Sequence, residues 1–147
     1  MADNRVSNGD QTIVPYLILH DVAGFMEFAC SIFGGVEVER MTDPDGRIMH
    51  AEIRIGSSLL MMGSAGEKWP AQPAGMYIYV ADVDALYHKA IAAGASSVHE
   101  PMDMFYGHRS AGVLDPYGNT WWLAKEIESL TEEELKRRHA EHAAASN

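Results

Sequence analysis

The stretch MHAEIRIG at positions 49–56 places three chemically active side chains at alternate positions, namely His50, Glu52 and Arg54. In an extended strand all three face one side, while Met49, Ala51, Ile53 and Ile55 face the other. A carboxylate beside an imidazole orients the ring and raises its basicity, so His50 and Glu52 are candidate catalytic residues for acid/base chemistry. Two alternatives stay open. Either Arg54 pairs with Glu52, or the three polar side chains are simply the solvent-exposed face of a half-buried strand.

A second group of candidates lies in the stretch MFYGHRSAG, which contains Tyr106, His108 and Arg109. A loop between strands is a common place for binding residues, and these three side chains are large and polar. The alternative is a structural loop in which Arg109 pairs with an acid such as Asp115.

The elements that must position these residues occur twice in the chain. YLILHDV at 16–22 matches YIYVADV at 77–83, and each run has the alternation of a strand. Asp21 and Asp82 stand where a helix N-cap belongs, and each following helical stretch ends in glycine. The two halves therefore begin with the same strand and helix.

The second halves of the two repeats also correspond. GSSLLMMG at 56–63 matches GNTWWLAK at 118–125, and each is preceded by a further apolar run. The pattern predicts an α+β fold of two βαβββ modules plus a C-terminal helix, which a Thr131–Glu134 capping box begins. We expect a flexible N-terminus at 1–11, modules at 12–63 and 75–128 in one domain, a linker at 64–74, and a C-terminal helix and tail at 129–147.

Several motifs carry a resemblance to a known family: PYLIL, IFGG, DGRIMHAEIRIG, VADVDAL, FYGHRSAGVLDPYGNTWWLA and LTEEELKRR. Together they resemble the vicinal oxygen chelate superfamily of glyoxalases, bleomycin-resistance proteins and dioxygenases, and within it the PhnB-like branch most closely. The resemblance implies paired half-barrels, with helices on the convex side and a ligand on the concave side. His108 stands where the PhnB-like branch leads us to expect an acidic residue.

The resemblance also bears on metal binding. Chelating members of the superfamily hold a divalent metal through His and Glu side chains on the first and last strands of each module. Carried over to this chain, these positions are Val14, Leu60, Gly75 and Trp122. None of these side chains can ligate a divalent metal, and neighbours one step away offer no carboxylate or imidazole. The expectation is therefore no metal and no cofactor, as in the bleomycin-resistance branch.

The same alternation predicts which apolar and aromatic side chains line the concave face. Large flat side chains with polar tips suit the binding of small organic molecules. The alternative is that the aromatic side chains fill the core, which is the placement we expect for Trp121. The complete set of candidate ligand-binding residues is Tyr16, His50, Glu52, Arg54, Leu60, Met62, Tyr77, Tyr79, Tyr106, His108, Arg109 and Trp122.

The composition of the chain indicates which kinds of partner and which compartment to expect. The formal net charge of −10 argues against nucleic acid and is compatible with a cationic ligand. A single cysteine excludes an intrachain disulfide and favours a reducing compartment, and no apolar run is long enough to span a membrane. We therefore expect a cytoplasmic protein with no membrane partner.

These observations favour a metal-independent protein that binds a small organic molecule, aromatic or cationic, as a drug-sequestering resistance protein does. Several superfamily members build each cleft from two subunits, so the resemblance also implies a homodimer. Enzyme activity stays open. The alternative function is a lyase, isomerase or dioxygenase that uses a displaced divalent metal or the His50–Glu52 pair.

Overall fold

A computed structural model describes residues 11–146 of the chain. The flexible N-terminus expected at 1–11 lies outside the described residues except for Gln11. The side-chain amide of Gln11 is hydrogen-bonded to both backbone groups of Leu59, accepting from its N–H at 2.7 Å and donating to its carbonyl at 3.1 Å. Among the described residues, no helix is long and apolar enough to cross a membrane.

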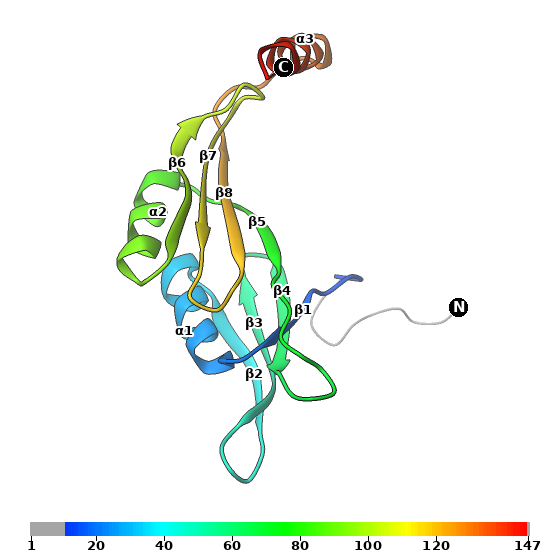
Figure 1. The fold of residues 1–147 in the computed structure, drawn as a ribbon, viewed down its shortest axis with the longest axis vertical. Helices are drawn as coiled ribbons and strands as arrows, with labels where there is room; N and C mark the ends of the chain where they lie inside the picture. Colours follow the sequence, from blue (N-terminus) through cyan, green and yellow to red (C-terminus); the bar gives the residue numbers. More distant parts are fainter. Residues whose placement is uncertain (1–10, 147) are drawn as a thin grey trace, which may run out of the picture. The chain divides into compact units, whose positions relative to one another are not determined.

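The first module has one helix and a four-stranded sheet (Figure 1). The strands stand in the order β1-β4-β3-β2, and only the β1–β4 pair is parallel. The elements are β1 (Tyr16–Leu19), α1 (Val22–Phe33), β2 (Val36–Thr42), β3 (Ile48–Ile55) and β4 (Ser58–Ser64).

The second module repeats this topology with the strand order β5-β8-β7-β6, in which β5 and β8 are parallel. The predicted α+β fold with two βαβββ modules is therefore confirmed. Its elements are β5 (Gly75–Tyr79), α2 (Val83–Ala92), β6 (Ser96–Asp103), β7 (His108–Leu114) and β8 (Thr120–Glu126), and the C-terminal helix α3 (Glu132–Ala145) follows.

The N-caps of α1 and α2 and the glycine that ends α1 are those that the sequence predicts, whereas the C-cap of α2 is Ala93, the residue before Gly94. Asp21 accepts a hydrogen bond from the Gly24 amide at 2.9 Å, and Asp82 accepts one from the Ala85 amide at 3.0 Å. These carboxylates satisfy donors that the first helical turn leaves unpaired. Gly34 ends α1 in the left-handed conformation, with φ 71°, which glycine adopts without a steric penalty.

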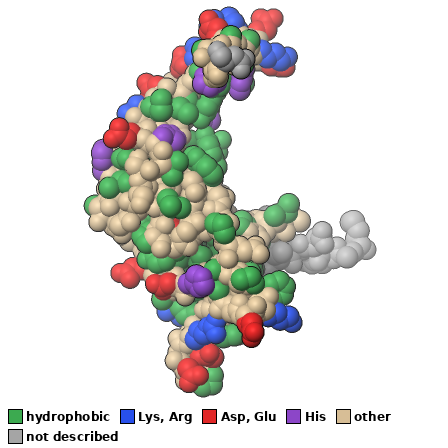
Figure 2. All heavy atoms as spheres, viewed as in Figure 1, with side chains coloured by type: hydrophobic (Ala, Val, Ile, Leu, Met, Phe, Trp, Pro, Cys, Tyr) green, Lys and Arg blue, Asp and Glu red, His purple; other side chains and the backbone are tan. Residues whose placement is uncertain are grey.

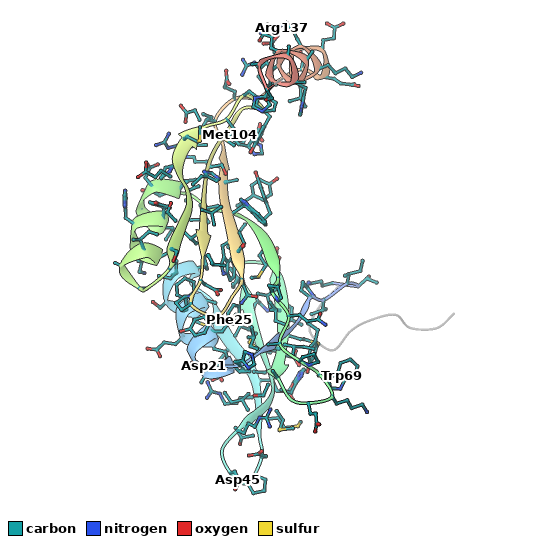
Figure 3. The ribbon with its side chains drawn as sticks, in the orientation of Figure 1. Asp21, Phe25, Asp45, Trp69, Met104 and Arg137 are labelled. Carbon is teal, nitrogen blue, oxygen red and sulfur yellow. The ribbon has the colours of Figure 1, made fainter. Side chains whose placement is uncertain are left out.

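Each module buries one face of its sheet under its own helix. In the first module, Leu19, Ala51 and Ile53 are fully buried, and Phe25 of α1 packs into the same core (Figure 3). In the second, Trp121 and the other inward residues of β7 and β8 are buried under α2. The core placement expected for Trp121 is thus confirmed.

By its contacts the chain forms two compact units. Of the described residues, the first unit comprises 11–74 with the turn 116–118, and the second comprises 75–115 and 119–146. The turn joins the first unit because the Tyr117 ring packs edge-on against Phe25 and Phe28 of α1.

The C-terminal helix is fixed to the turn between β6 and β7. Arg138 donates to the Phe105 carbonyl and to the Glu128 carboxylate, and the Phe105 ring stacks on His142 at 4.2 Å between ring centroids. Figure 2 shows acidic and basic side chains gathered on this helix. Its Thr131 cap accepts from the Glu134 amide, as the capping box predicts.

Candidate functional site

The His50–Glu52 pair of β3 forms as the alternation predicts. His50 Nε2 lies 2.9 Å from Glu52 Oε2, and the Glu52 residue is only 4% exposed. A buried carboxylate needs a partner, and the imidazole supplies one. Arg54 follows on the same strand, where it lies opposite Val36 and Leu59.

Tyr16 extends this pair into a chain of three side chains. Its hydroxyl oxygen lies 3.2 Å from His50 Nδ1, so both ring nitrogens of the histidine have polar neighbours. Gly63 of β4 makes room for the phenol, because a Cβ atom there would stand 2.9 Å from the Tyr16 hydroxyl. The absence of a side chain at Gly63 therefore allows the Tyr16–His50 contact.

The chemistry of the three groups sets the direction of their hydrogen bonds. An ionised carboxylate only accepts, so in a neutral imidazole the Nε2 that faces Glu52 carries the proton. His50 Nδ1 is then an acceptor and receives the Tyr16 O–H. This arrangement can draw a proton from Tyr16 toward His50 while Glu52 stabilises the imidazolium that forms.

Glu39 of β2 joins the same group, although sequence reasoning did not single it out. Glu39 lies directly across from Glu52, whereas Glu37 lies across from Ile53 on the core side. The ladder shifts by one residue between Glu37 and Glu39, as in a β-bulge. Simple alternation would put both glutamates on one face, so no signal in the sequence pattern reveals that the bulge separates them.

The pairings of β4 correct the expected placement of Leu60 and Met62. Tyr16 lies beside Met61, while Leu60 and Met62 lie across from the buried Ile53 and Ala51. Leu60 and Met62 are therefore core residues, 7% and 0% exposed. In the second module Tyr77 lies beside Trp122, so Met61 corresponds to Trp122. The repeat alignment at 56–63 was one residue out, and such a slip exchanges the two faces of a strand.

Met49 is also placed differently from the simple alternation. It is half exposed, while Ile48 is buried, because the β2–β3 ladder shifts between the Met41–His50 and Thr42–Ile48 pairs. The irregularity turns the Met49 side chain out of the core.

The metal-ligand positions that the resemblance implies carry no carboxylate or imidazole side chain in this chain. With the corrected register they are Val14, Met61, Gly75 and Trp122, which offer no carboxylate or imidazole. The Trp122 ring lies against Gly75, where a Cβ atom would stand 2.9 Å from the indole. In the second module an aromatic ring thus occupies the space beside the ligand position.

A pocket of about 370 Å³ opens beside Tyr16 in the first unit. Its lining includes Trp69, which is 62% exposed on the loop after β4 (Figure 3) and which sequence reasoning did not assign to the site. The volume is within the range of small-molecule sites. The lining residues are Tyr16, Ile18, Met49, Gly63, Ser64 and Trp69.

The second module gathers a mainly aromatic group on the face of Trp122. The Tyr77 hydroxyl lies 3.2 Å from His108 Nδ1, and the rings of Tyr79 and Tyr106 contact the His108 ring. Partial burial of the phenol, together with the neighbouring Tyr106, raises the pKa of Tyr77 to about 12. Four of the candidate ligand-binding residues from two separate stretches, Tyr77, Tyr79, Tyr106 and His108, therefore lie together.

Arg109 does not join this aromatic group. Its guanidinium binds the Asp84 carboxylate of α2 through two hydrogen bonds, of 2.6 and 2.8 Å, and Asp103 of β6 at 2.9 Å. Arg109 holds the pKa of Asp84 below its usual value. The alternative of a structural Arg109 gains support, with a correction of its partner: Asp115 is buried and accepts from Trp121 Nε1 at 2.8 Å instead.

Comparison with known proteins places this geometry in a family. Residues 12–123 match the model of the Glyoxalase/Bleomycin resistance protein/Dioxygenase superfamily. An uncharacterized protein of Mycobacterium tuberculosis is 28% identical over 145 residues, covering 91% of this chain and 85% of that protein.

Solved structures show the same fold. TioX from Micromonospora sp. ML1 superposes with a TM-score of 0.67 at 25% identity, over 78% of this chain and 98% of TioX. A PhnB protein from Bacillus cereus superposes with a TM-score of 0.61 at 18% identity, over 77% of this chain and 98% of that one. From the family match and the repeated βαβββ topology, we conclude that the chain belongs to the Glyoxalase/Bleomycin resistance protein/Dioxygenase superfamily.

Proposed function

We propose that this protein binds a small organic molecule in the pocket beside Tyr16, with no metal at the positions that the family uses. The observation that carries the proposal is the pocket of about 370 Å³ between Tyr16 and Trp69. Small-molecule sites are concave, mostly apolar and supplied with a few polar groups, and this lining has that character.

The lining indicates which ligands would fit. Trp69 and Tyr16 offer aromatic faces, which bind flat rings by stacking and cations through their quadrupoles. The Met49 thioether adapts to irregular shapes. A net charge of −10 favours cationic compounds. The ligand class is therefore an aromatic compound that carries a positive charge, and sequestration of a drug of this class would give resistance.

The test is a tryptophan fluorescence titration with bleomycin and a panel of smaller cationic aromatic compounds. We expect saturable quenching that Trp69→Phe abolishes and Tyr16→Ala weakens about 10-fold, since one buried aromatic contact contributes about 1.4 kcal/mol. Trp122→Phe is the matched control in the second module and should leave the affinity unchanged. Absence of saturation with every compound, or quenching that follows Trp122 alone, would contradict the proposal.

A second candidate function rests on the Tyr16–His50–Glu52 chain, because Tyr16 also lines the pocket. In this alternative the Tyr16 hydroxyl gives its proton to His50, its phenolate oxygen takes a proton from a bound carbon acid, and Glu52 stabilises the imidazolium. This is the proton transfer that a lyase or an isomerase needs. NMR in deuterated water would detect exchange of protons next to a carbonyl. Tyr16→Phe should stop the exchange and keep the binding. If none of the compounds that bind to the protein shows this proton exchange, the proposed enzyme activity is contradicted.

The assembly and compartment remain predictions from the sequence. We expect a homodimer, which sedimentation equilibrium of the full chain would detect as twice the monomer mass. A monomer across the accessible concentration range would contradict it. A fluorescent-protein fusion would test the expected cytoplasmic location.

A further inference from the structure

We propose that Glu39, His50 and Glu52 form a binding site for a divalent transition-metal ion, separate from the positions that the family uses. One ligand atom from each residue can be chosen such that all three lie within 4.8 Å of one another. Two carboxylate oxygens and one imidazole nitrogen are ligands that zinc and manganese accept.

The fold brings the three residues together through the β-bulge in β2. His50 and Glu52 share one face of β3 because they are two residues apart. The register shift between Glu37 and Glu39 then places Glu39 directly opposite Glu52. Bulges commonly re-aim a side chain next to a functional site, and this one delivers the third ligand.

The charges of Glu39 and Glu52, which lie directly opposite each other on neighbouring strands, give a second reason to expect a cation. Glu39 and Glu52 are like-charged cross-strand neighbours, an arrangement that destabilises a sheet. Glu52 is also 4% exposed, so water screens its charge poorly. A divalent cation between the carboxylates would convert their repulsion into attraction.

The hydrogen bond to Tyr16 indicates which nitrogen of His50 would bind. Nε2 faces Glu52 and Nδ1 faces the Tyr16 hydroxyl. The cation would take the place of the proton on Nε2, and Nδ1 would then carry the hydrogen and donate it to the Tyr16 oxygen. Metal-binding histidines usually donate their second N–H to such a partner, which fixes the ring.

The site would leave coordination positions for other ligands. A metal site with three protein ligands and open coordination positions is typical of catalytic rather than structural metal sites. Glu39 is exposed, so these open positions have access to solvent. The metal site and the ligand pocket are independent proposals, since the pocket beside Tyr16 needs no cation to bind an organic molecule.

The experiment is calorimetric titration of the full chain, freed of metal with EDTA, with Zn²⁺ and with Mn²⁺. We expect saturation at one ion per chain. Glu39→Gln should weaken binding about 100-fold, and Tyr16→Phe, which removes only the partner of Nδ1, about 10-fold. Glu39 is an exposed residue, so its variant keeps the fold, which circular dichroism would verify.

Glu37→Gln is the matched control. It removes the same charge from the same strand, but Glu37 lies across from Ile53 and pairs with Arg40. We expect Glu37→Gln to bind both metals as the unchanged protein does. Three results would overturn the proposal: no saturable binding of either ion, Glu39→Gln binding as tightly as the unchanged protein, or Glu37→Gln weakening binding as much as Glu39→Gln. The last would indicate only diffuse attraction to an acidic surface.

Discussion

In each module one row of residues crosses the four-stranded sheet from its first strand to its second. The two rows occupy equivalent positions but contain different side chains. In the first module the row runs Tyr16, Met61, Glu52, Glu39 from β1 to β2. In the second it runs Tyr77, Trp122, Gly112, His99 from β5 to β6. The ladder shifts by one residue just before the fourth member in both, between Glu37 and Glu39 and between Ser97 and His99.

The comparison separates what the fold supplies from what the residues supply. Both sheets provide a leading tyrosine, and both tyrosines reach a histidine at 3.2 Å. The first module fills the rest of the row with a methionine and two carboxylates, and the carboxylates suit proton transfer or a cation. The second fills it with an indole, a glycine and an imidazole, and has no carboxylate there. The same backbone therefore carries a polar site in one module and an aromatic surface in the other.

Gly112→Glu would place in the second module the carboxylate that the first one has. We expect a loss of about 4 kcal/mol in the free energy of unfolding, measured by urea denaturation, from overpacking and from burial of a charge. A Cβ atom at Gly112 would stand 3.0 Å from the His99 ring and 3.1 Å from Val98. Gly112→Ala, which adds only the Cβ, should cost about 1 kcal/mol. Equal stability of Gly112→Glu and the unchanged protein would show that the second row could hold the same site.

Asp115→Ala tests a second difference between the modules. Trp121 occupies in β8 the core position that Leu60 occupies in β4, and its N–H needs an acceptor that leucine does not. Asp115 supplies it at 2.8 Å and also accepts from the Asn119 amide. We expect Asp115→Ala to lower the free energy of unfolding by about 3 kcal/mol, because two buried donors lose their acceptor. In the Trp121→Phe background the loss should be smaller, and an equal loss would contradict this account.

The sequence predicted the parts of both modules that depend on local chemistry. The caps at Asp21 and Asp82 and the glycine after α1 follow from the needs of helix ends, so they were readable. The His50–Glu52 contact was readable because both residues lie on a regular part of β3. The repeat itself gave the fold class.

The remainder depended on register, which alternation does not encode. Aligning Gly56 with Gly118 ignored the different lengths of the β3–β4 and β7–β8 turns, and the resulting slip moved Leu60 and Met62 to the wrong face. Glu39 was missed because the register shift before it interrupts the alternation. Trp69 was missed because it lies on an irregular loop, where no periodicity indicates direction.

Gly63→Ala compares the tyrosines of the two modules. Gly63 lies beside Ile18 in β4, whereas the equivalent position in β8, beside Tyr79, is Ala124. A Cβ atom at Gly63 would stand 2.9 Å from the Tyr16 hydroxyl and 3.0 Å from the Met49 carbonyl. We expect a loss of about 2 kcal/mol in the free energy of unfolding, together with weaker binding in the pocket. Ala124→Gly, the reverse change, should leave ligand affinity unchanged. Unchanged ligand affinity of Gly63→Ala would show that the added Cβ does not displace the Tyr16 ring that lines the pocket.

The smallest expected effect concerns the ionisation of Tyr77. Although half of this side chain is exposed, its hydroxyl lies beside His108 and near Tyr106, and its pKa is raised from 10 to about 12. Between pH 10 and about 12, the Tyr77 hydroxyl therefore keeps its proton in the folded protein but has lost it in the unfolded chain. The contribution of the protonated Tyr77 to the free energy of unfolding is therefore fully present below pH 10 and is lost as the pH rises through about 12. Ultraviolet titration of phenolate should show one late tyrosine that disappears in Tyr77→Phe. Tyr106→Phe should lower the pKa of Tyr77, because Tyr106 contributes to raising it. If the late titration survives Tyr77→Phe, another tyrosine carries it, and this contrast between the aromatic module and the polar one fails.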